Sequence, residues 1–314
     1  MATIWNVFNK RKMRMVGMFL LLMFICMALF GPMIYPHAPA VHPNDLYLPP
    51  SWNHLLGTDY AGRNILPQIV LGARNVLYVA VMAAIFTVAI GTLVGLAAGY
   101  LGPTVDTILM RITDMFLTIP SIALILILAV TIGMSNYFVM AGILSFAAWG
   151  GMARAIRSMV LSVRERSFVE VSQGLGMSRW YVIIKEILPN LLPYIVVHLM
   201  LALTGAVYGE VGLFFLGVVP FKSDNWGVML NFATGGSGAM YSTRSLMFLA
   251  SPILAIVLLQ TGIVLCTDAV NELVDPRLRN SLGGAYTHGR GRSRSRAASV
   301  RRVSVGSGRS AGGR

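Results

Sequence analysis

Residues 115–153 read MFLTIPSIALILILAVTIGMSNYFVMAGILSFAAWGGMA, and no Asp, Glu, Lys or Arg interrupts these 39 residues. A helix needs about 20 apolar residues to cross the hydrocarbon core of a membrane. The stretch is therefore long enough for two membrane-spanning helices, with Gly133–Asn136 as the expected turn between them. The whole chain has the same character, because 56% of its 314 residues are hydrophobic and its mean hydropathy is +0.69. Such a composition indicates a polytopic membrane protein and excludes an ordinary soluble domain.

Four more apolar runs without charge lie on either side of this stretch, at residues 15–35, 76–101, 191–209 and 246–267. Together they predict an all-α integral membrane protein with six transmembrane helices. The first run follows a basic cluster, as the apolar part of a cleaved signal peptide does. However, residues 31–40 (GPMIYPHAPA) are proline-rich and offer no small-residue cleavage site. We therefore expect the first helix to be retained.

The positions of the 25 Lys and Arg residues predict the orientation, because basic residues beside a span stay on the cytoplasmic side. A cytoplasmic N-terminus places 21 of them inside and four outside. The expected organisation is a cytoplasmic N-terminus (1–14), a six-span domain (15–280) and a cytoplasmic C-terminal tail (281–314). Within the six-span domain, external loops are expected at about 36–75 and 210–245, and a cytoplasmic loop at about 154–190.

The tail from residue 281 onward is rich in Ser, Gly and Arg and has no acidic residue. It contains too little apolar surface to form a packed core, so we expect it to be disordered and to touch anionic lipid at most. Nucleic-acid binding is the alternative, but the arginine-rich part carries no Phe, Trp or Tyr on which a base would stack. No nucleic-acid partner is expected.

The expected cytoplasmic loop contains the most polar segment before the tail, RERSFVEVSQGLGMSRWYVIIKEILPN at residues 164–190. Ser167 and Glu170 have the spacing of a capping box, which predicts the start of a short helix. Gly176 is suited to the positive φ of a sharp turn, and a second helix is predicted over residues 178–187. Two short helices that project from the membrane form a rigid surface on which another protein can dock.

Residue patterns for catalysis, metal binding and ATP binding are missing from the sequence. The five His residues lack the spacing of metal ligands on a helix, and there is no Gly-x-x-x-x-Gly-Lys phosphate-binding loop. Cys26 and Cys266 fall in predicted spans, where they are expected to act as small apolar side chains. We expect a protein that is not an enzyme, holds no cofactor or metal, and takes any energy for its work from another subunit.

The polar segment resembles the EAA loop of ATP-binding cassette importer permeases, in which a short coupling helix docks on the ATPase. The matching positions are Glu170, Val171, Ser172, Gly176, Leu188 and Pro189. The sequence departs from the family pattern at Val171 and Ser172, where alanines are usual, and at Glu186, where an apolar residue is usual. The resemblance implies that this segment, with Gly174 and Leu175 at its turn, docks on an ATPase.

Further motifs, in the same order along the chain, resemble one branch of these permeases, the oligopeptide, dipeptide and nickel family. LGTDYAGRNIL at residues 56–66 is similar to the signature that follows the first span in that family. Other similar motifs are GAR (72–74), MRITD (110–114), EVGLFFLG (210–217), WGVML (226–230) and DPRLR (275–279). The short N-terminus and the long first external loop are most similar to the C-type subunit.

The resemblance implies the fold of a type I importer and a role as half of a translocation pore in a bacterial or archaeal plasma membrane. The implied partners are a homologous B-type permease, two cytoplasmic ATPase subunits, an external solute-binding protein and the lipid bilayer. Peptides are the expected solutes, with oligosaccharides or nickel as the alternative. A secondary transporter is disfavoured, because its sites lie on broken helices or intramembrane carboxylates, whereas charges here cluster at the ends of spans. A basic scaffold would explain only the tail.

A compact external turn is expected within the LGTDYAGRNIL motif. Its residues are Gly57, Thr58, Asp59, Gly62 and Arg63. An Asx-type hydrogen bond at Asp59 would close this turn. We expect these residues to shape the loop rather than to touch the solute.

Charged and aromatic residues near the ends of the spans are the remaining candidates. Arg111 and Asp114 are three residues apart near the cytoplasmic end of the third span and are expected to form a structural ion pair, with a role in a gate as the alternative. Glu210, at the outer end of the fifth span, is a candidate for pairing across a subunit interface. Trp52 and Trp226 are expected to anchor the chain at the membrane surface, with contact to an external partner as the alternative.

Overall fold

A computed structural model of the chain describes residues 12–133, 136–218, 225–236 and 245–274. The chain divides into two compact units, residues 1–270 and 271–314, and the following description concerns the first. Most of the expected N-terminal segment, the two middle residues of the Gly133–Asn136 turn, the DPRLR motif and the tail lie outside the described residues.

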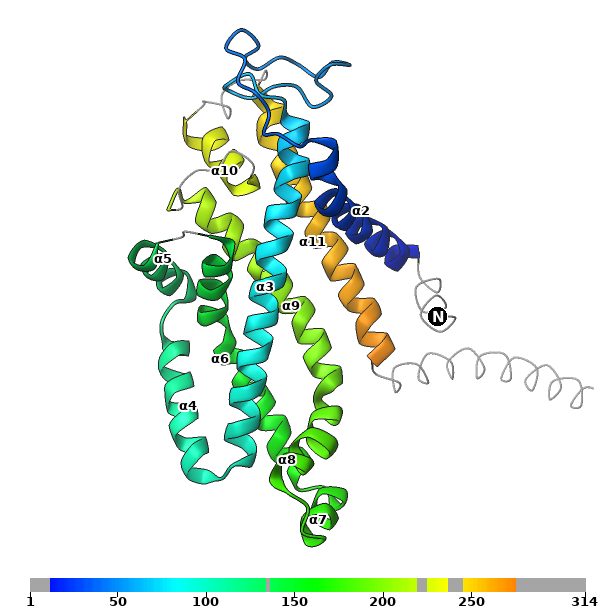
Figure 1. Cartoon of the computed structure of the whole chain (residues 1–314), viewed down its shortest axis with the longest axis vertical. Helices are drawn as coiled ribbons and strands as arrows, with labels where there is room; N and C mark the ends of the chain where they lie inside the picture. Colours follow the sequence, from blue (N-terminus) through cyan, green and yellow to red (C-terminus); the bar gives the residue numbers. More distant parts are fainter. Residues whose placement is uncertain (1–11, 134–135, 219–224, 237–244, 275–314) are drawn as a thin grey trace, which may run out of the picture. The chain divides into compact units, whose positions relative to one another are not determined.

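The described residues are nearly all helical, with an isolated bridge between Thr58 and Asn64 and no named strand. The α-helices are α2 (Lys12–Ile34), α3 (Ile65–Tyr100), α4 (Pro103–Thr118), α5 (Ser121–Ile132), α6 (Tyr137–Arg164), α7 (Ser167–Gly174), α8 (Arg179–Tyr181), α9 (Leu188–Phe215), α10 (Trp226–Asn231) and α11 (Leu246–Val274). Two π-helical segments are η1 (Val182–Ile187) and η2 (Phe232–Gly236). Five helical stretches are long and apolar enough to cross a membrane, and a sixth span is counted if α4 and α5 form one broken span. The expected all-α membrane architecture is confirmed (Figure 1).

The first of the two spans expected within residues 115–153 is broken. Helix α4 already begins at Pro103, and α4 and α5 meet at an angle of 90°. Ile119 between them is extended, with φ −83° and ψ 127°, because the ring of Pro120 disfavours helical geometry in the residue before it. A hydropathy pattern does not reveal this break, because Ile119 and Pro120 are uncharged and lie within an apolar run.

The tightest helix pair, α3 with α6, is packed through glycines at four-residue spacing. A Cβ atom at Gly91 would lie 2.8 Å from the Met152 side chain, and one at Gly95 would lie 2.6 Å from the Ala153 carbonyl oxygen. Such contacts are closer than real Cβ atoms allow. Small residues at regular spacing let two membrane helices approach closely, which fixes α3 and α6 against each other.

Trp226 lies in the core and not on the surface of the chain. Its side chain is fully buried, its indole N–H donates to the carbonyl of Ile69 (3.0 Å), and its ring meets Phe24 edge-on at 5.7 Å. Short helix α10 is thereby pinned to α3. The expectation that Trp226 is a surface anchor was therefore wrong, whereas Trp52 in the loop between α2 and α3 is 96% exposed.

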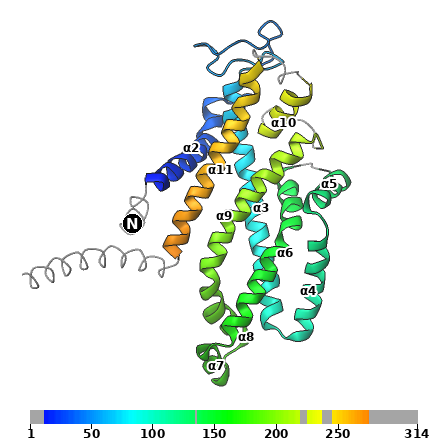
Figure 2. The ribbon, with the colours of Figure 1, turned by 180° about the vertical axis from the view of Figure 1, so that it is seen from behind.

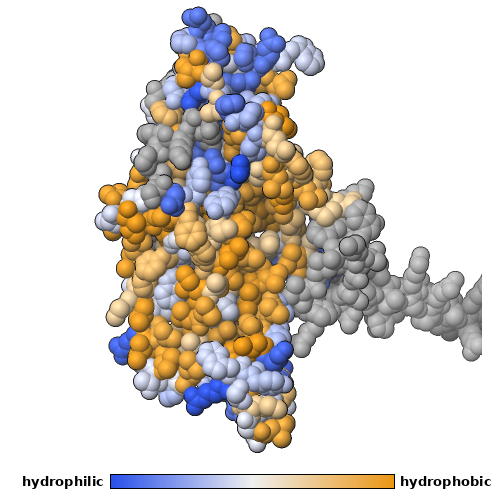
Figure 3. Space-filling model, viewed as in Figure 1, coloured by the Kyte–Doolittle hydropathy of each residue, from blue (hydrophilic) through white to orange (hydrophobic). Residues whose placement is uncertain are grey.

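The surface of the first unit has the polarity expected of a membrane protein. In Figure 3 hydrophobic residues cover most of its middle, and hydrophilic residues gather over the loop between α2 and α3 and over the opposite end, near α7 and α8. The loop between α2 and α3 and the short helices α7 and α8 therefore lie at opposite ends of the same helical bundle.

Candidate functional site

The first candidate site is the tip formed by α7 and α8, between the ends of α6 and α9 (Figure 1, Figure 2). Helix α7 ends in a tight turn. The N–H of Leu175 donates to the carbonyl of Val171 (3.0 Å), and the N–H of Met177 donates to that of Ser172 (3.2 Å). Gly176 between them has φ +77°, which side chains disfavour. The expected positive φ at Gly176 is confirmed.

One buried side chain secures α7 to the bundle. Val169 is fully buried in an apolar cluster that includes Val160 of α6 and Val182 and Ile187 of η1. The next residue, Glu170, is exposed. Helix α7 therefore rests on one face and leaves the other open.

The tip exposes three large apolar side chains among its polar residues. Val171, Leu175 and Trp180 are 61%, 71% and 70% exposed, and we call these three residues the tip surface. Large apolar side chains gain about 1.5–3 kcal/mol each when they are fully buried. Their concentration on a short, tightly turned element is typical of a protein-docking surface.

The expected capping box at the start of α7 is not formed. Arg166, not Ser167, occupies the N-cap position, and no side chain caps the helix. The Arg166 carbonyl instead accepts from the N–H groups of Val169 (2.9 Å) and Glu170 (3.2 Å). The carboxylate of Glu170 is therefore not used as a cap and stays on the exposed side of the tip.

The expected second short helix is the beginning of the fifth span. Helical geometry is continuous from Arg179 to Phe215, through α8, η1 and α9. The N–H of Leu188 bonds to the carbonyl of Ile183, five residues back, just before Pro189, which has no N–H to donate. Leu188 and Pro189 thus lie in the first turn of α9, where the π turn joins the tip to the span without a loop.

Two ion pairs join α4 to α6 near the end of the bundle that carries the tip. Arg157 makes a two-pronged pair with Asp106, with two N···O distances of 2.5 Å, and Arg154 pairs with Asp114 at 2.6 Å. The expected partner of Asp114 was Arg111 on the same helix. That expectation was wrong, because the partner comes from α6, 40 residues away in sequence.

The loop between α2 and α3, which we expect to be external and call the outer loop, contains the second candidate site, the turn around Asp59. The buried Asp59 carboxylate accepts from the N–H groups of Ala61 (2.8 Å) and Arg63 (2.9 Å), from the Arg63 guanidinium (2.8 Å) and from the Gln68 amide (3.0 Å). The expected Asx-type turn is confirmed.

Residues close to Asp59 in the sequence stabilise the same loop. The hydroxyl of Thr58 accepts from the N–H of Leu48 (2.8 Å) and donates to the carbonyl of Asp45. Gly57 and Gly62 have φ +79° and +73°, and a Cβ atom at either would overlap a backbone carbonyl oxygen. The turn is therefore a self-contained structural unit.

Glu210 is enclosed within the chain. Its carboxylate is fully buried on α9 and accepts from the Asn225 amide (3.0 Å), beside the start of α10. The expectation that Glu210 pairs across a subunit interface is contradicted, because the side chain has no exposed surface to offer a second chain.

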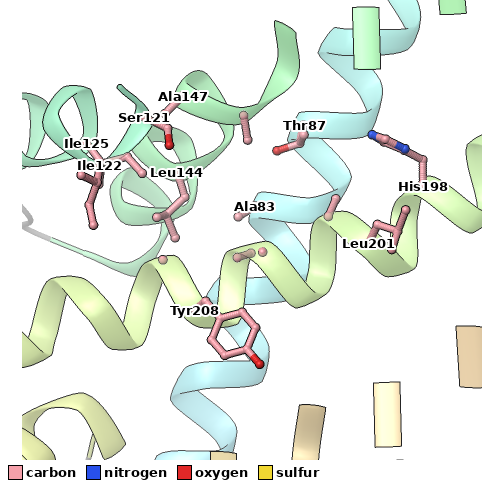
Figure 4. A pocket seen from close by; sticks show the side chains of 15 residues that line it. Ala83, Thr87, Ser121, Ile122, Ile125, Leu144, Ala147, His198, Leu201 and Tyr208 are labelled. Carbon is pink, nitrogen blue, oxygen red and sulfur yellow. The ribbon is translucent and has the colours of Figure 1, made fainter. Parts of the chain in front are cut away.

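A cavity of about 520 Å³ opens between α3, α5, α6 and α9 (Figure 4). Most of its lining is apolar, and its polar side chains are Thr87, Ser121, His198 and Tyr208. None of the described residues that line it is Asp, Glu, Lys or Arg. Among the described residues no group of three His, Cys, Asp or Glu side chains is placed to hold a metal ion.

Residues 91–280 match the family described as "Binding-protein-dependent transport system inner membrane component", and residues 1–50 match the "N-terminal TM domain of oligopeptide transport permease C". The chain belongs to this permease family. It is therefore a non-catalytic membrane subunit of an ATP-binding cassette importer, a class of transporter that works with an ATPase and a substrate-binding protein.

Curated relatives of the permease match it over most of their length. The dipeptide transport system permease protein DppC of Bacillus subtilis (strain 168) is 34% identical over 281 residues, which is 88% of this chain and 85% of the relative. The oligopeptide transport system permease protein OppC of the same strain is 30% identical over 87% of this chain and 88% of the relative. A putative peptide permease protein of Brucella suis biovar 1 is 33% identical over 88% and 91%, respectively.

The fold of the permease is similar to that of a solved importer. A chain from inward-facing structures of the MetNI methionine ABC transporter aligns with a TM-score of 0.52 and 20% sequence identity. The alignment covers 66% of this chain and 96% of that chain. The expected architecture of an importer permease is thus confirmed.

The cavity is the feature of the permease that the sequence did not reveal. Its polar lining comes from three helices, α3, α5 and α9, and Thr87 and His198 lie more than 100 residues apart in the chain. Single Ser, Thr, Tyr and His residues on apolar spans carry no spacing signal, so only the packing of the helices brings them together.

Proposed function

We propose that this permease is the C-type membrane subunit of a peptide importer. The printed names of the relatives, dipeptide, oligopeptide and putative peptide permeases, favour peptides. Oligosaccharides or nickel remain the alternative from the sequence resemblance. In this proposal the permease pairs with a homologous B-type permease, receives solute from an external binding protein, and is driven by two cytoplasmic ATPase subunits.

The observation that carries the proposal is the exposed tip surface on a fixed base. Val171, Leu175 and Trp180 face away from the bundle, while Val169 and the turn at Gly176 hold α7 in place. An ATPase that binds this surface and moves would carry α7 with it. Because α8, η1 and α9 are one continuous helix, displacement of the tip would reach the fifth span directly.

The test is the amount of ATPase that stays on the purified transporter. Leu175→Asp places a charge in the middle of the proposed contact. We expect retained ATPase to fall at least about tenfold, because loss of one important interface side chain weakens binding by about this factor. The matched control is Leu55→Asp, an exposed Leu in the outer loop. Full retention by Leu175→Asp would contradict ATPase docking at the tip.

The proposed orientation has both termini in the cytoplasm. A reporter that is active only in the cytoplasm should work when it is fused after Arg164 and fail when it is fused after Asn53. Activity at Asn53 would contradict the proposed orientation.

Competition of peptide uptake by nickel or by an oligosaccharide would identify the alternative solutes.

A further inference from the structure

We propose that the cavity between α3, α5, α6 and α9 is the water-filled passage for the solute through this half of the transporter, and that it does not select solutes by charge. This inference rests on the proposed function, and it adds the residues that contact the solute. Figure 4 shows Thr87, Ser121 and His198 reaching into the same space from three different helices, with Tyr208 on α9 farther along.

The depth of the cavity in the membrane follows from helix geometry. Gly95 of α3 is level with Ala153 of α6, whose neighbour Arg154 is paired with Asp114. Arg74 lies 21 residues earlier on α3, and no other charged residue falls between it and Gly95. At 1.5 Å per residue these 21 residues span about 31 Å, the thickness of the hydrocarbon core. Arg74 and Arg154 therefore mark its two edges.

The lining residues of α3 lie between these edges. Thr87 and Ala83 are 8 and 12 residues from Gly95. These separations correspond to about 12 and 18 Å along the helix, close to the middle of the membrane. The cavity therefore lies near the middle of the membrane, the depth at which secondary transporters also hold their solutes.

The break in the third span provides independent support. Ile119, Pro120 and Ser121 are exposed in the chain, and Ser121 lines the cavity. Ile119 is five residues from Asp114, so the break lies about 7 Å inside the hydrocarbon core. Pro120 has no N–H to return to the carbonyl four residues back, which leaves polar backbone at membrane depth. Irregular backbone is tolerated there only within protein or beside water, not against lipid.

The chemistry of the lining indicates what can pass. Thr87, Ser121 and Tyr208 offer hydroxyl groups and His198 offers an imidazole, while none of the lining residues is Asp, Glu, Lys or Arg. At Gly205 a Cβ atom would meet nothing within 4 Å, so the wall is open there. Hydroxyls act as donors and as acceptors, and they satisfy amide groups without preference for a formal charge. The passage therefore suits small solutes rich in amide groups and leaves selection by charge to other subunits.

Thiol accessibility tests the passage without any solute. In an assembled transporter with Cys26→Ala and Cys266→Ala, held in lipid nanodiscs, Thr87→Cys is compared with Ile85→Cys. Thr87 is 5% exposed and Ile85 45% exposed on the opposite side of α3. A charged methanethiosulfonate should label Thr87→Cys at least about ten times faster, because thiolates form and react in water and not in lipid. Ser121→Cys should behave like Thr87→Cys. Faster labelling of Ile85→Cys than of both cavity variants would overturn the proposal.

Charge selectivity tests the second half of the inference. Uptake of a tripeptide with a central Glu is compared with that of one with a central Lys, per assembled complex. Ser121→Asp should lower the Glu-to-Lys uptake ratio by about tenfold through like-charge repulsion. Ser121→Asn, whose side chain has the same shape as that of the Asp variant but no charge, should leave this ratio unchanged. An unchanged ratio in Ser121→Asp would contradict a solute contact at this position. Failure of the unmodified transporter to import either peptide would instead contradict the proposed solute, and the labelling result would still decide the passage.

Discussion

The turn around Asp59, which we call the outer turn after its expected external position, and the tip formed by α7 and α8 contrast in where their residues find partners. In the outer turn, buried Asp59 is bonded to four donors from its own chain, and Thr58 is bonded on both sides of its hydroxyl. In the tip, Leu175 and Trp180 are about 70% exposed and contribute little to the fold. Both segments resemble family motifs in the sequence. The outer motif maintains the fold of the permease, whereas we propose that the tip serves a partner.

This contrast is sharpest at two glycines with nearly equal backbone geometry. Gly62 in the outer turn has φ +73° and Gly176 in the tip has φ +77°. A Cβ atom at Gly62 would lie 1.9 Å from the carbonyl oxygen of His42, whereas one at Gly176 would meet nothing within 4 Å. The same substitution at the two positions therefore separates a role in folding from a role in docking.

The largest effect on folding is expected for Gly62→Val. The β-branched side chain disfavours positive φ and would overlap the His42 carbonyl, whose residue is also bonded through its N–H to Ala61 (3.2 Å). Backbone strain and overlap together cost about 2–6 kcal/mol. We expect a marked fall in the midpoint of thermal unfolding of the purified protein, or loss of folded protein altogether. An unchanged midpoint would mean that the outer loop is not the rigid unit described.

Gly176→Val should spare the fold and disrupt coupling. Its strain of about 1–3 kcal/mol is confined to one position with no steric overlap, so the unfolding midpoint should stay close to that of the unmodified protein. The turn that orients the tip surface would nevertheless change. We expect at least about a tenfold loss of retained ATPase and of solute-stimulated ATP hydrolysis. Normal coupling in Gly176→Val would argue against docking through this turn.

Local chemistry explains which features the sequence predicted. Positive φ at Gly176 and the hydrogen bonds of Asp59 arise from residues within a few positions of each other, so their spacing was sufficient. The apolar runs likewise predicted the helical membrane architecture, because hydropathy measures the cost of each residue in lipid.

Features that depend on distant residues could not be predicted in this way. Asp114 pairs with a residue 40 positions away, and the indole N–H of buried Trp226 donates to a carbonyl 157 positions away. The capping box failed for a different reason. The spacing of Ser167 and Glu170 fits a cap, but the chain enters α7 one residue earlier, with Arg166 at the N-cap position. The break at Ile119 and the cavity beside it arise from packing that hydropathy does not record.

The two α4–α6 ion pairs should differ in their effect on stability. Arg157 and Asp106 form a two-pronged pair with side chains 32% and 19% exposed, whereas Arg154 and Asp114 are 56% and 59% exposed. Because solvent screens exposed pairs, Arg157→Ala should cost about 1–2 kcal/mol, and Arg154→Ala should leave the unfolding midpoint nearly unchanged. Thermal unfolding of the two variants in parallel is the measurement. Equal shifts would show that exposure does not separate the two pairs.

The smallest effect is expected at Ser178, whose hydroxyl caps α8 by accepting from the N–H of Tyr181 (3.3 Å). Loss of an N-cap costs about 0.5–1 kcal/mol, and here the helix continues without interruption into α9, whose packing in the bundle keeps the first turn in place. Ser178→Ala should therefore leave the unfolding midpoint within error and lower retained ATPase by less than about threefold. The informative comparison is with Thr58→Ala in the outer turn, where a 2% exposed residue loses both its donor and its acceptor bond. If Ser178→Ala lowered the midpoint as much as Thr58→Ala, the tip would depend on its own hydrogen bonds as the outer turn does, and the contrast between the two regions would fail.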